Sequence, residues 1–365
     1  MVARDELPDW LRLTLVPGIG GERQRQLLAA LGPPGRIFAA GHAAIAKVIG
    51  APHADRLLDA DTGESVAAAV AWANEPGNSI LCLGETAYPR ALLEIHDPPV
   101  LLYVKGNAAL LSAPGLAIVG ARSATPQGIA NASAFARSLS RAGLAIVSGL
   151  ALGIDAAAHE GALDGAGGTI AVIGTGADRI YPARNAALAR RIAASGAIVS
   201  EFPLGTPPAA HNFPRRNRLI AGLARGVLVV EAALDSGSLI TARLAAEQGR
   251  EVFAIPGSIH SPLSKGCHRL IRDGAKLVET ASDILEELPQ HTCHDATQHP
   301  EALADAGSSD SAASSVLVAL GHDPVDGDTL ALRCGLTADA LYAILLPMEL
   351  DGHVARLPGG RFQRL

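Results

Sequence analysis

The middle of the chain alternates short apolar runs with helical patterns, and this alternation restricts the fold more than any other feature. Six runs have the length and composition of buried strands, and amphipathic helix patterns lie between them. Continuous apolar strands joined through helices form a parallel sheet that is covered on both faces. The sequence therefore predicts a doubly wound, Rossmann-like α/β domain. The runs are LAIVG at 116–120, LAIVSG at 144–149, TIAVIG at 169–174, AIVSE at 197–201, GVLVVEA at 226–232 and EVFAIPG at 251–257.

Breaks in composition divide the rest of the chain. NEPGNS, at 74–79, separates a helix-rich start from the sheet region. A later stretch is poor in large apolar residues and has no periodicity, which is typical of a linker. We predict four parts, namely a helical domain at 1–75, the Rossmann-like domain at 76–288, a linker at 289–313 and a small winged-helix-like domain at 314–365.

Cysteine and histidine usage predicts no metal site. The four cysteines have no CxxC spacing, which argues against a disulfide framework and against zinc. Cys293 lies near three histidines of the linker, but such clusters in a polar linker are mostly incidental. The histidines are His291, His294 and His299.

The start of the chain and its apolar runs bear on localisation. No apolar run reaches the roughly 18 to 20 residues that a membrane-spanning helix needs. The first residues, MVARDELPDWLRL, carry acids where a signal peptide carries an apolar stretch. We therefore expect a cytoplasmic protein with no membrane contact.

Charge is distributed unevenly along the chain. The 365 residues carry a net charge of −6, which is unpromising for a protein that binds nucleic acid. Residues 1–75 hold 7 basic and 9 acidic side chains, and residues 314–365 hold 4 and 6. Residues 76–288 hold 19 and 17, so only the middle region is net positive. We expect this region to carry any binding to a polyanion without help from the flanks.

Ligands of such sheets bind at the carboxyl ends of the strands, so the residues that follow each run are the candidate site. After the first run, Gly120 permits a tight turn and Arg122 projects into the crevice. Ser123 or Thr125 can cap the next helix. A helix start with free N–H groups beside an arginine is an anion site.

Two further turns resemble phosphate cradles. In SGLALGIDAAAH, at 148–159, Gly149 and Gly153 let the backbone approach a ligand, and Asp155 can cap the next helix. Ser148, at the start of this turn, is a further candidate for DNA binding. A tight turn with a capping aspartate is the plainer interpretation, and it stays open. The run at 226–232 is followed by a turn that opens another helix, with Ser236, Gly237 and Ser238. None of these turns is the dinucleotide fingerprint G-x-G-x-x-G, so we predict no nicotinamide cofactor, and no other cofactor is expected.

The stretch FPRRNRLIAGLARGVLVVEA, at 213–232, sets three arginines at the same rim. Together with Arg122 they would form one phosphate pocket, and a ring beside fixed cations is how single-stranded bases are commonly stacked. The alternative is that these arginines pair with buried acids in a structural network. Asn217 and Arg218 would be the first members of such a network. The cluster is Phe213, Arg215, Arg216, Asn217 and Arg218.

Seven ordered blocks in residues 88–275 resemble the DNA-processing protein A (DprA, also called Smf) family. They include IVGARSAT, SGLALGIDAAAHEGAL, FPRRNRLIAGLARGVLVVEA and SGSLITARLAAEQGREVFAIPG. The resemblance implies a cytoplasmic bacterial protein that binds incoming single-stranded DNA during natural transformation. It further implies that the protein shields this strand, helps to load the RecA recombinase onto it and acts as a homodimer. The family's DNA pocket falls here on Arg122 and on 213–218, although His211 stands near the position where the family often has a lysine.

The two flanks leave alternatives open. Helix, Pro17-Gly18-Ile19-Gly20 turn and helix, at 13–32, resemble a helix-hairpin-helix and also the sterile-alpha-motif-like domain of the family. With Arg23 and Arg25 after the turn, this domain either contacts DNA or serves as a scaffold. The end of the chain resembles a winged helix, but residues 337–351 have no basic side chain. A DNA-reading helix needs basic or amide side chains, so protein contact or regulation is favoured there.

An enzyme is the rival class. Nucleotide phosphoribohydrolases of the lysine-decarboxylase-like group use a related sheet, and Asp155, His159, Glu201 and Glu231 could serve as acids or bases. Those hydrolases carry a PGGxGT turn, whereas this chain reads DSGSLITA there. We therefore predict a binding protein without catalytic residues. A module that binds a free nucleotide remains a third possibility.

Overall fold

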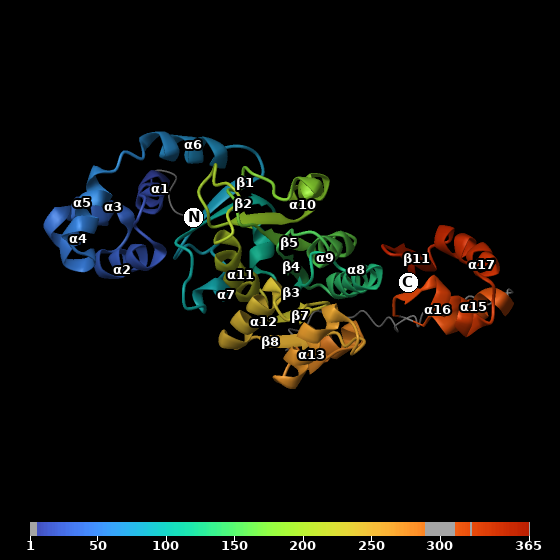
Figure 1. The fold of residues 1–365 in the computed structure, drawn as a ribbon. Helices are drawn as coiled ribbons and strands as arrows, with labels where there is room; N and C mark the ends of the chain where they lie inside the picture. Colours follow the sequence, from blue (N-terminus) through green and yellow to red (C-terminus); the bar gives the residue numbers. More distant parts are fainter. Residues whose placement is uncertain (1–5, 289–310, 322, 365) are drawn as a thin grey trace.

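The computed structural model describes residues 6–288, 311–321 and 323–364. Six helices come first, a large sheet with its covering helices follows, and a small unit forms the end of the chain (Figure 1). Most of the predicted linker, with Cys293 and its three histidines, lies outside the described residues.

The six predicted strands all form, and they pair in parallel. From one side to the other the order is β6-β5-β4-β3-β7-β8, so the chain runs outward from β3 and then returns to its other side. This confirms the doubly wound prediction, and it creates a topological switch point between β3 and β7. The strands are β3 (Gly115–Val119), β4 (Ala145–Ser148), β5 (Thr169–Val172), β6 (Ala197–Ser200), β7 (Gly226–Val229) and β8 (Glu251–Ala254).

Three strands that the sequence analysis did not predict extend the sheet to nine. β1 (Asn78–Cys82) and β2 (Leu101–Gly106) form an antiparallel hairpin, and β2 pairs antiparallel with β6. β9 (Lys276–Leu277) adds a short parallel strand beside β8. Antiparallel strands at the edge of a largely parallel sheet are common, because a hairpin needs no crossover helix.

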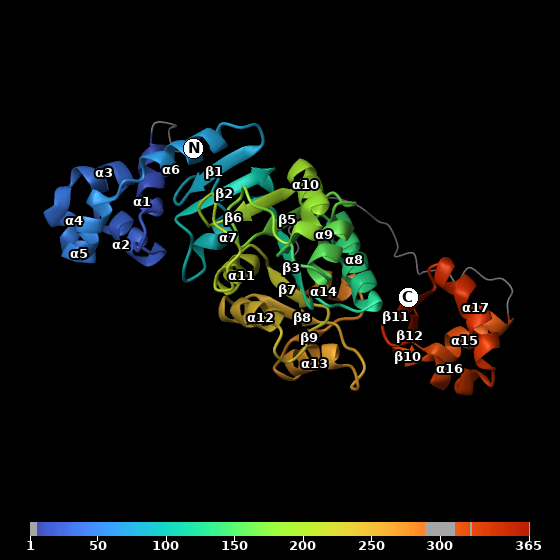
Figure 2. The ribbon, with the colours of Figure 1, turned by 45° about the horizontal axis from the view of Figure 1, so that its top comes forward.

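Helices cover both faces of the sheet, because successive strand residues point to opposite sides (Figures 1 and 2). Val119 packs toward one set of helices and Ile118 toward the other. The first set is α7 (Arg90–Leu93), α11 (Asn212–Gly222), α12 (Gly237–Glu247) and α13 (Lys265–Arg272). The second set is α8 (Pro126–Arg141), α9 (Ile154–Ala162), α10 (Ala186–Ser195) and α14 (Ala281–Glu287). Three short 3₁₀ helices, η1 (Ala108–Ser112), η2 (Ala183–Asn185) and η3 (Pro262–Ser264), lie in the connections.

The N-terminal helices share a hydrophobic core with the sheet. Trp10 and Trp72 pack with Tyr103 of β2, and the rings of Trp72 and Tyr103 meet edge to face at 5.7 Å. Removal of residues 1–75 would uncover this apolar surface, so the structure does not favour our expectation that the middle region works alone. The helices are α1 (Leu7–Leu15), α2 (Gly21–Leu31), α3 (Pro34–Ala39), α4 (Gly41–Ile49), α5 (Ala51–Asp59) and α6 (Gly63–Ala73).

The C-terminal unit has the predicted winged-helix arrangement of helices and a small antiparallel sheet, in the order β10-β12-β11. Its first helix begins inside the stretch predicted as linker. The elements are α15 (Ser311–Leu320), β10 (Val325–Asp326), α16 (Gly327–Cys334), α17 (Ala338–Leu350), β11 (Val354–Leu357) and β12 (Arg361–Arg364).

No single helix within the described ranges is long and apolar enough to cross a membrane. Helices α16 and α17 reach that length and composition only as a pair, and they are bent by 104° relative to each other.

Candidate nucleic-acid interface

A cavity of about 480 Å³ opens at the switch point between β3 and β7. It is here called the switch-point pocket. Its wall combines the turn after β3, the start of α11 and the turn that opens α12. Eight residues that the sequence analysis selected line it, namely Gly120, Arg122, Phe213, Arg216, Asn217, Ser236, Gly237 and Ser238.

One side of the pocket carries two aromatic rings beside an exposed arginine. The guanidinium of Arg122 lies 5.6 Å from the ring centre of Phe213, and the ring of Tyr181 lies 5.8 Å from that of Phe213. Tyr181 is 45% exposed, and the sequence analysis missed it. Tyr181 could have been identified from the sequence, because it is an aromatic residue shortly after the third predicted strand in a chain with few aromatic residues. The exposed ring of Tyr181 and the half-buried ring of Phe213 together offer a stacking surface for successive bases.

A buried arginine and a nearby buried aspartate form the floor. Arg216 is only 4% exposed, donates to the carbonyl oxygen of Val172 at 2.5 Å, and faces the buried carboxylate of Asp155. Burial lowers the pKa of Arg216 to about 10, which leaves it charged at neutral pH, and Asp155 opposes the shift. Burial also raises the pKa of Asp155, while the charge of Arg216 lowers it. The nearby carboxylate of Asp155 therefore favours the charged form of Arg216 at the floor of the pocket.

Two glycines are required by the close packing around this floor. A side chain at Gly149 would overlap the guanidinium of Arg216. A Cβ atom at Gly120 would lie 2.6 Å from Ile154 and 2.9 Å from the carbonyl oxygen of Glu231. Gly149 also lines a smaller cavity of about 60 Å³, together with Arg122 and Tyr181. The close approach that we expected a ligand to make at these glycines is made instead by other parts of the protein, namely Arg216 at Gly149 and Ile154 with Glu231 at Gly120.

The start of α8 is not a free anion site, which corrects our interpretation of the turn after β3. The carboxylate of Glu231 accepts from the backbone N–H of Thr125 at 2.9 Å and from its hydroxyl at 2.6 Å. The hydroxyl of Thr125 in turn accepts from Gly128 N–H and caps the helix. The protein's own carboxylate therefore occupies the position expected for an anion, and Ser123 lies exposed in the turn without capping the helix.

Asp155 does not cap α9, which corrects a second expectation. The N-cap of α9 is Gly153, at φ +75°, and no side chain caps this helix. The carboxylate of Asp155 instead accepts from the backbone N–H groups of Gly149 and Ala151, at 3.1 and 3.4 Å. Ser148 is fully buried, and its hydroxyl donates to the carbonyl of Ile118. It presents no surface to the pocket, and the turn is stabilised internally.

The turn before α12 keeps the predicted arrangement. Ser236 is the N-cap of this helix, and its hydroxyl accepts from the backbone N–H of Ser238 at 3.3 Å. The side chain of Asn217 reaches from α11 to the carbonyl oxygen of Gly237 at 3.4 Å. Asn217 therefore lines the pocket and is not part of the buried ion network for which it was considered.

The arginines of α11 do not form one pocket, because consecutive residues of a helix point in directions about 100° apart. Arg216 faces the switch-point pocket, whereas Arg215 and Arg218 face a separate cleft of about 240 Å³ on the other side of α11. There Arg218 forms ion pairs with Glu201 and with Asp97, the latter at 3.3 Å. The prediction that Arg218 belongs to a structural network is confirmed. Arg215 is 58% exposed and lies 3.9 Å from Glu201.

The four acids and bases considered for catalysis have separate structural contacts. His159 is fully buried, its Nδ1 lies 2.6 Å from the hydroxyl of Thr169, and its Nε2 accepts from Leu150 N–H. Burial, aided by the charge of Arg216, lowers the pKa of His159 to about 3, so this ring is neutral. Glu201 pairs with Arg218, Glu231 holds Thr125, and Asp155 faces Arg216, as given above.

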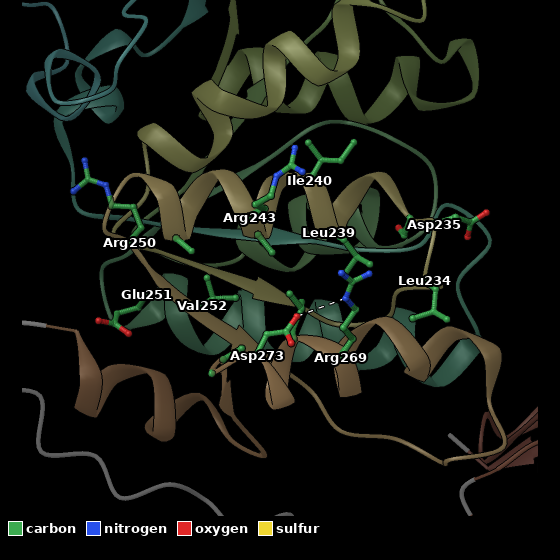
Figure 3. A pocket seen from close by; sticks show the side chains of 16 residues that line it. Leu234, Asp235, Leu239, Ile240, Arg243, Arg250, Glu251, Val252, Arg269 and Asp273 are labelled. Atoms are coloured by element: carbon green, nitrogen blue, oxygen red, sulfur yellow. Dashed lines mark ion pairs between the residues drawn. The ribbon is translucent and has the colours of Figure 1, made fainter.

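A larger cavity, of about 570 Å³, lies between α12, β8 and α13 (Figure 3). Leu239, Val252 and Leu270 line it with apolar surface, and charged side chains surround them. The guanidinium of Arg269 lies 3.6 Å from the carboxylate of Asp273. No sequence signal marks this cavity, because the apolar residues that line it belong to the ordinary periodicities of helices and strands.

Comparison with known proteins places these features in context. A family model described as DNA recombination-mediator protein A matches residues 79–289, and a model of the DprA winged helix domain matches residues 299–360. The chain is similar to "Protein Smf" of Escherichia coli K12, with 43% identity over 300 residues, which are 81% of this chain and 80% of that protein.

Two solved structures are also similar. DNA processing protein A of Streptococcus pneumoniae has a TM-score of 0.69 and 40% identity, covering 80% of this chain and 99% of that one. DNA processing protein A of Helicobacter pylori, whose structure is described in terms of a single-stranded DNA binding mode, has a TM-score of 0.53 and 34% identity. The match covers 57% of this chain and 94% of that one.

Proposed function

Because the chain belongs to the DNA recombination-mediator protein A family, we propose that it binds single-stranded DNA in the switch-point pocket. One observation carries the proposal: Arg122, with no ion pair among the described residues, lies beside the half-buried ring of Phe213 and the exposed ring of Tyr181. A guanidinium attracts the phosphates of a strand, and the rings stack its bases. Stacking tolerates any base, so the pocket binds with little dependence on sequence.

The division of roles follows from burial. Arg122 is exposed and meets a phosphate directly, whereas Arg216 supplies positive charge from the floor, where its hydrogen bond to the carbonyl of Val172 positions it. On the opposite wall, Gly237 adds the backbone N–H of a helix start, and Ser236 and Ser238 add hydroxyl groups. We propose that Gly120 and Gly149 serve by allowing these walls to approach one another.

The wider role that the family resemblance implies is part of the proposal. In it, a cytoplasmic homodimer protects incoming strands during natural transformation and helps to load a RecA-type recombinase. The exposed Leu277, 44% accessible on the edge strand β9, supports a surface for a second copy, because an uncovered apolar sheet edge favours pairing. The protein acts here by binding and not by catalysis, since the candidate acids and bases are engaged in structural contacts.

Fluorescence anisotropy across a salt series tests the proposal. Labelled single-stranded DNA should bind more tightly than duplex DNA of the same length and far more tightly than free AMP, and the affinity should fall as salt rises. Equal or tighter binding to the duplex would refute the proposal. Affinity for AMP that matches the affinity for the oligonucleotide would favour a module for free nucleotides, and release of free base from AMP would favour a hydrolase.

A further inference from the structure

The cleft on the other side of α11 has the features of a second ligand site. One wall is the N-terminal hairpin, by which we mean the turn between α1 and α2 with the first residues of α2, and the other wall is the end of β6. The cavity is here called the hairpin cleft. Its volume of about 240 Å³ suits one small planar group and not a large ligand. Gly20, Gly21 and Arg25 line it from the hairpin side, and Glu201 and Arg215 line it from the sheet side.

Two buried polar atoms that line this cleft have no hydrogen-bond partner. They are Oε1 of Glu201 and the hydroxyl of Tyr103, whose side chains are 6% and 2% exposed. The other carboxylate oxygen of Glu201 is already engaged by Arg218 and lies 3.9 Å from Arg215. A buried acceptor without a donor is costly to a fold, and nearly all such groups are satisfied by something. Oε1 of Glu201 is therefore an acceptor whose hydrogen bond a donor group of a ligand can supply.

The mouth of the cleft attracts negative charge. Arg215 is 58% exposed, and its guanidinium lies 5.3 Å from the ring centre of Phe202. Helix α2 begins beside it at Gly21 without a side-chain cap, which favours negative charge there. Asp97 also lines the cleft, and Arg25 and Arg218 balance its charge. The cleft thus joins an anion-attracting rim to a deep hydrogen-bond acceptor.

We propose that the hairpin cleft holds one nucleotide of the bound single strand, and that an exocyclic amine of its base donates to Oε1 of Glu201. The inference rests on the proposed function. The phosphate lies at the rim with Arg215 and the start of α2, and the base enters the cleft. Cytosine, adenine and guanine carry such an amine, whereas thymine and uracil carry none.

The path of the strand follows from the first turn of α11. Pro214 lines the switch-point pocket and Arg215, the next residue, lines the hairpin cleft. The two sites therefore flank the same turn of α11, and a strand that crosses this turn, about 10 Å wide with its side chains, passes from one site to the other. Arg25 of the hairpin is already engaged by Asp97 and by the carbonyl of Pro98, so it does not supply a free charge to DNA. The hairpin contributes instead by forming the wall of the cleft opposite Glu201.

The test compares oligo-dC with oligo-dU of equal length, using the full-length protein and fluorescence anisotropy. Cytosine presents an amine where uracil presents a carbonyl oxygen, which the carboxylate of Glu201 repels. We expect dC to bind about tenfold more tightly than dU, the factor that corresponds to one hydrogen bond to a charged acceptor. Glu201→Gln should bring the two affinities to within about twofold, since an amide can also donate to uracil. Phe213→Ala is the matched control and should weaken both oligonucleotides while preserving their ratio.

The outcomes separate this inference from the proposed function. Equal binding of dC and dU by the unaltered protein overturns the base site and leaves the switch-point pocket standing, and this comparison does not depend on whether a variant folds. A folded Glu201→Gln protein that keeps the tenfold preference also overturns the base site. Binding of neither oligonucleotide refutes the proposed function itself. Free dCMP that binds as tightly as oligo-dC overturns the assignment of the cleft to a strand.

Discussion

Arg122 and Arg216 lie at the same pocket, yet their replacement by alanine should have opposite effects on stability and binding. Arg216 is 4% exposed and faces Asp155, which is 7% exposed. Its removal leaves a buried carboxylate without its countercharge, and it also leaves the carbonyl of Val172 without its donor. Loss of the donor to a buried carbonyl, together with loss of the charge that favours a buried carboxylate, costs on the order of 3 kcal/mol. For a domain of this size we expect the melting temperature to fall by roughly 10 °C.

The stability lost by Arg216→Ala should depend on pH in a predictable direction. Burial already raises the pKa of Asp155 in the folded protein, and loss of Arg216 raises it further. An acid whose pKa is higher in the folded state than in the unfolded state destabilises the fold increasingly as pH rises through the interval between the two values. The difference in melting temperature between the variant and the unaltered protein should therefore shrink as pH is lowered from 7 toward about 4, the unfolded pKa of aspartate.

Arg122→Ala should leave the melting temperature almost unchanged, because the side chain is exposed and its nearest ring contact contributes only about 0.5 to 1 kcal/mol at such a site. Its effect should fall on binding. Loss of one phosphate contact to a single strand flattens the plot of log affinity against log salt by about 0.7. Differential scanning fluorimetry and anisotropy on both variants check this. A large fall in melting temperature with an unchanged salt slope for Arg122→Ala would refute the assignment.

Three further outcomes follow from the same geometry. Phe213→Ala and Tyr181→Ala should each weaken binding to single-stranded DNA by about 1 to 3 kcal/mol with little change in salt slope, which anisotropy measures; an unaltered affinity would remove that ring from the stacking surface. Gly149→Ala should displace Arg216 and lower both affinity and melting temperature, and a variant as stable as the unaltered protein would contradict the close approach. Arg218→Ala should destabilise the protein by about 3 kcal/mol in a denaturant titration and leave the salt slope as it was, whereas a flattened slope would show that it meets DNA.

The fold of the central region could be predicted from the sequence because its signals are local. Each buried strand is a short apolar run, and its neighbours are helices with a periodic apolar face, so the order of elements dictates a doubly wound sheet. The residues after each run were correctly identified as the rim for the same reason, and most of them line one pocket. The antiparallel strands β1 and β2 escaped prediction because they stand outside the regular alternation of parallel strands and long helices, with only the short helix α7 between them.

Contacts between distant parts of the chain decided the rest. Glu231 reaches Thr125 across 106 positions and fills the helix start that the sequence offered to an anion, and Arg218 meets Asp97 across 121. The hydrogen bond from Arg216 to the carbonyl of Val172 and the packing of Trp72 on Tyr103 are of the same kind. By itself the sequence determined the elements and the residues at their ends, because periodicity and turn chemistry are properties of neighbours. Which charges face a ligand and which are neutralised inside the fold was decided by tertiary structure, because burial and the direction of each side chain on its helix depend on strand order and packing.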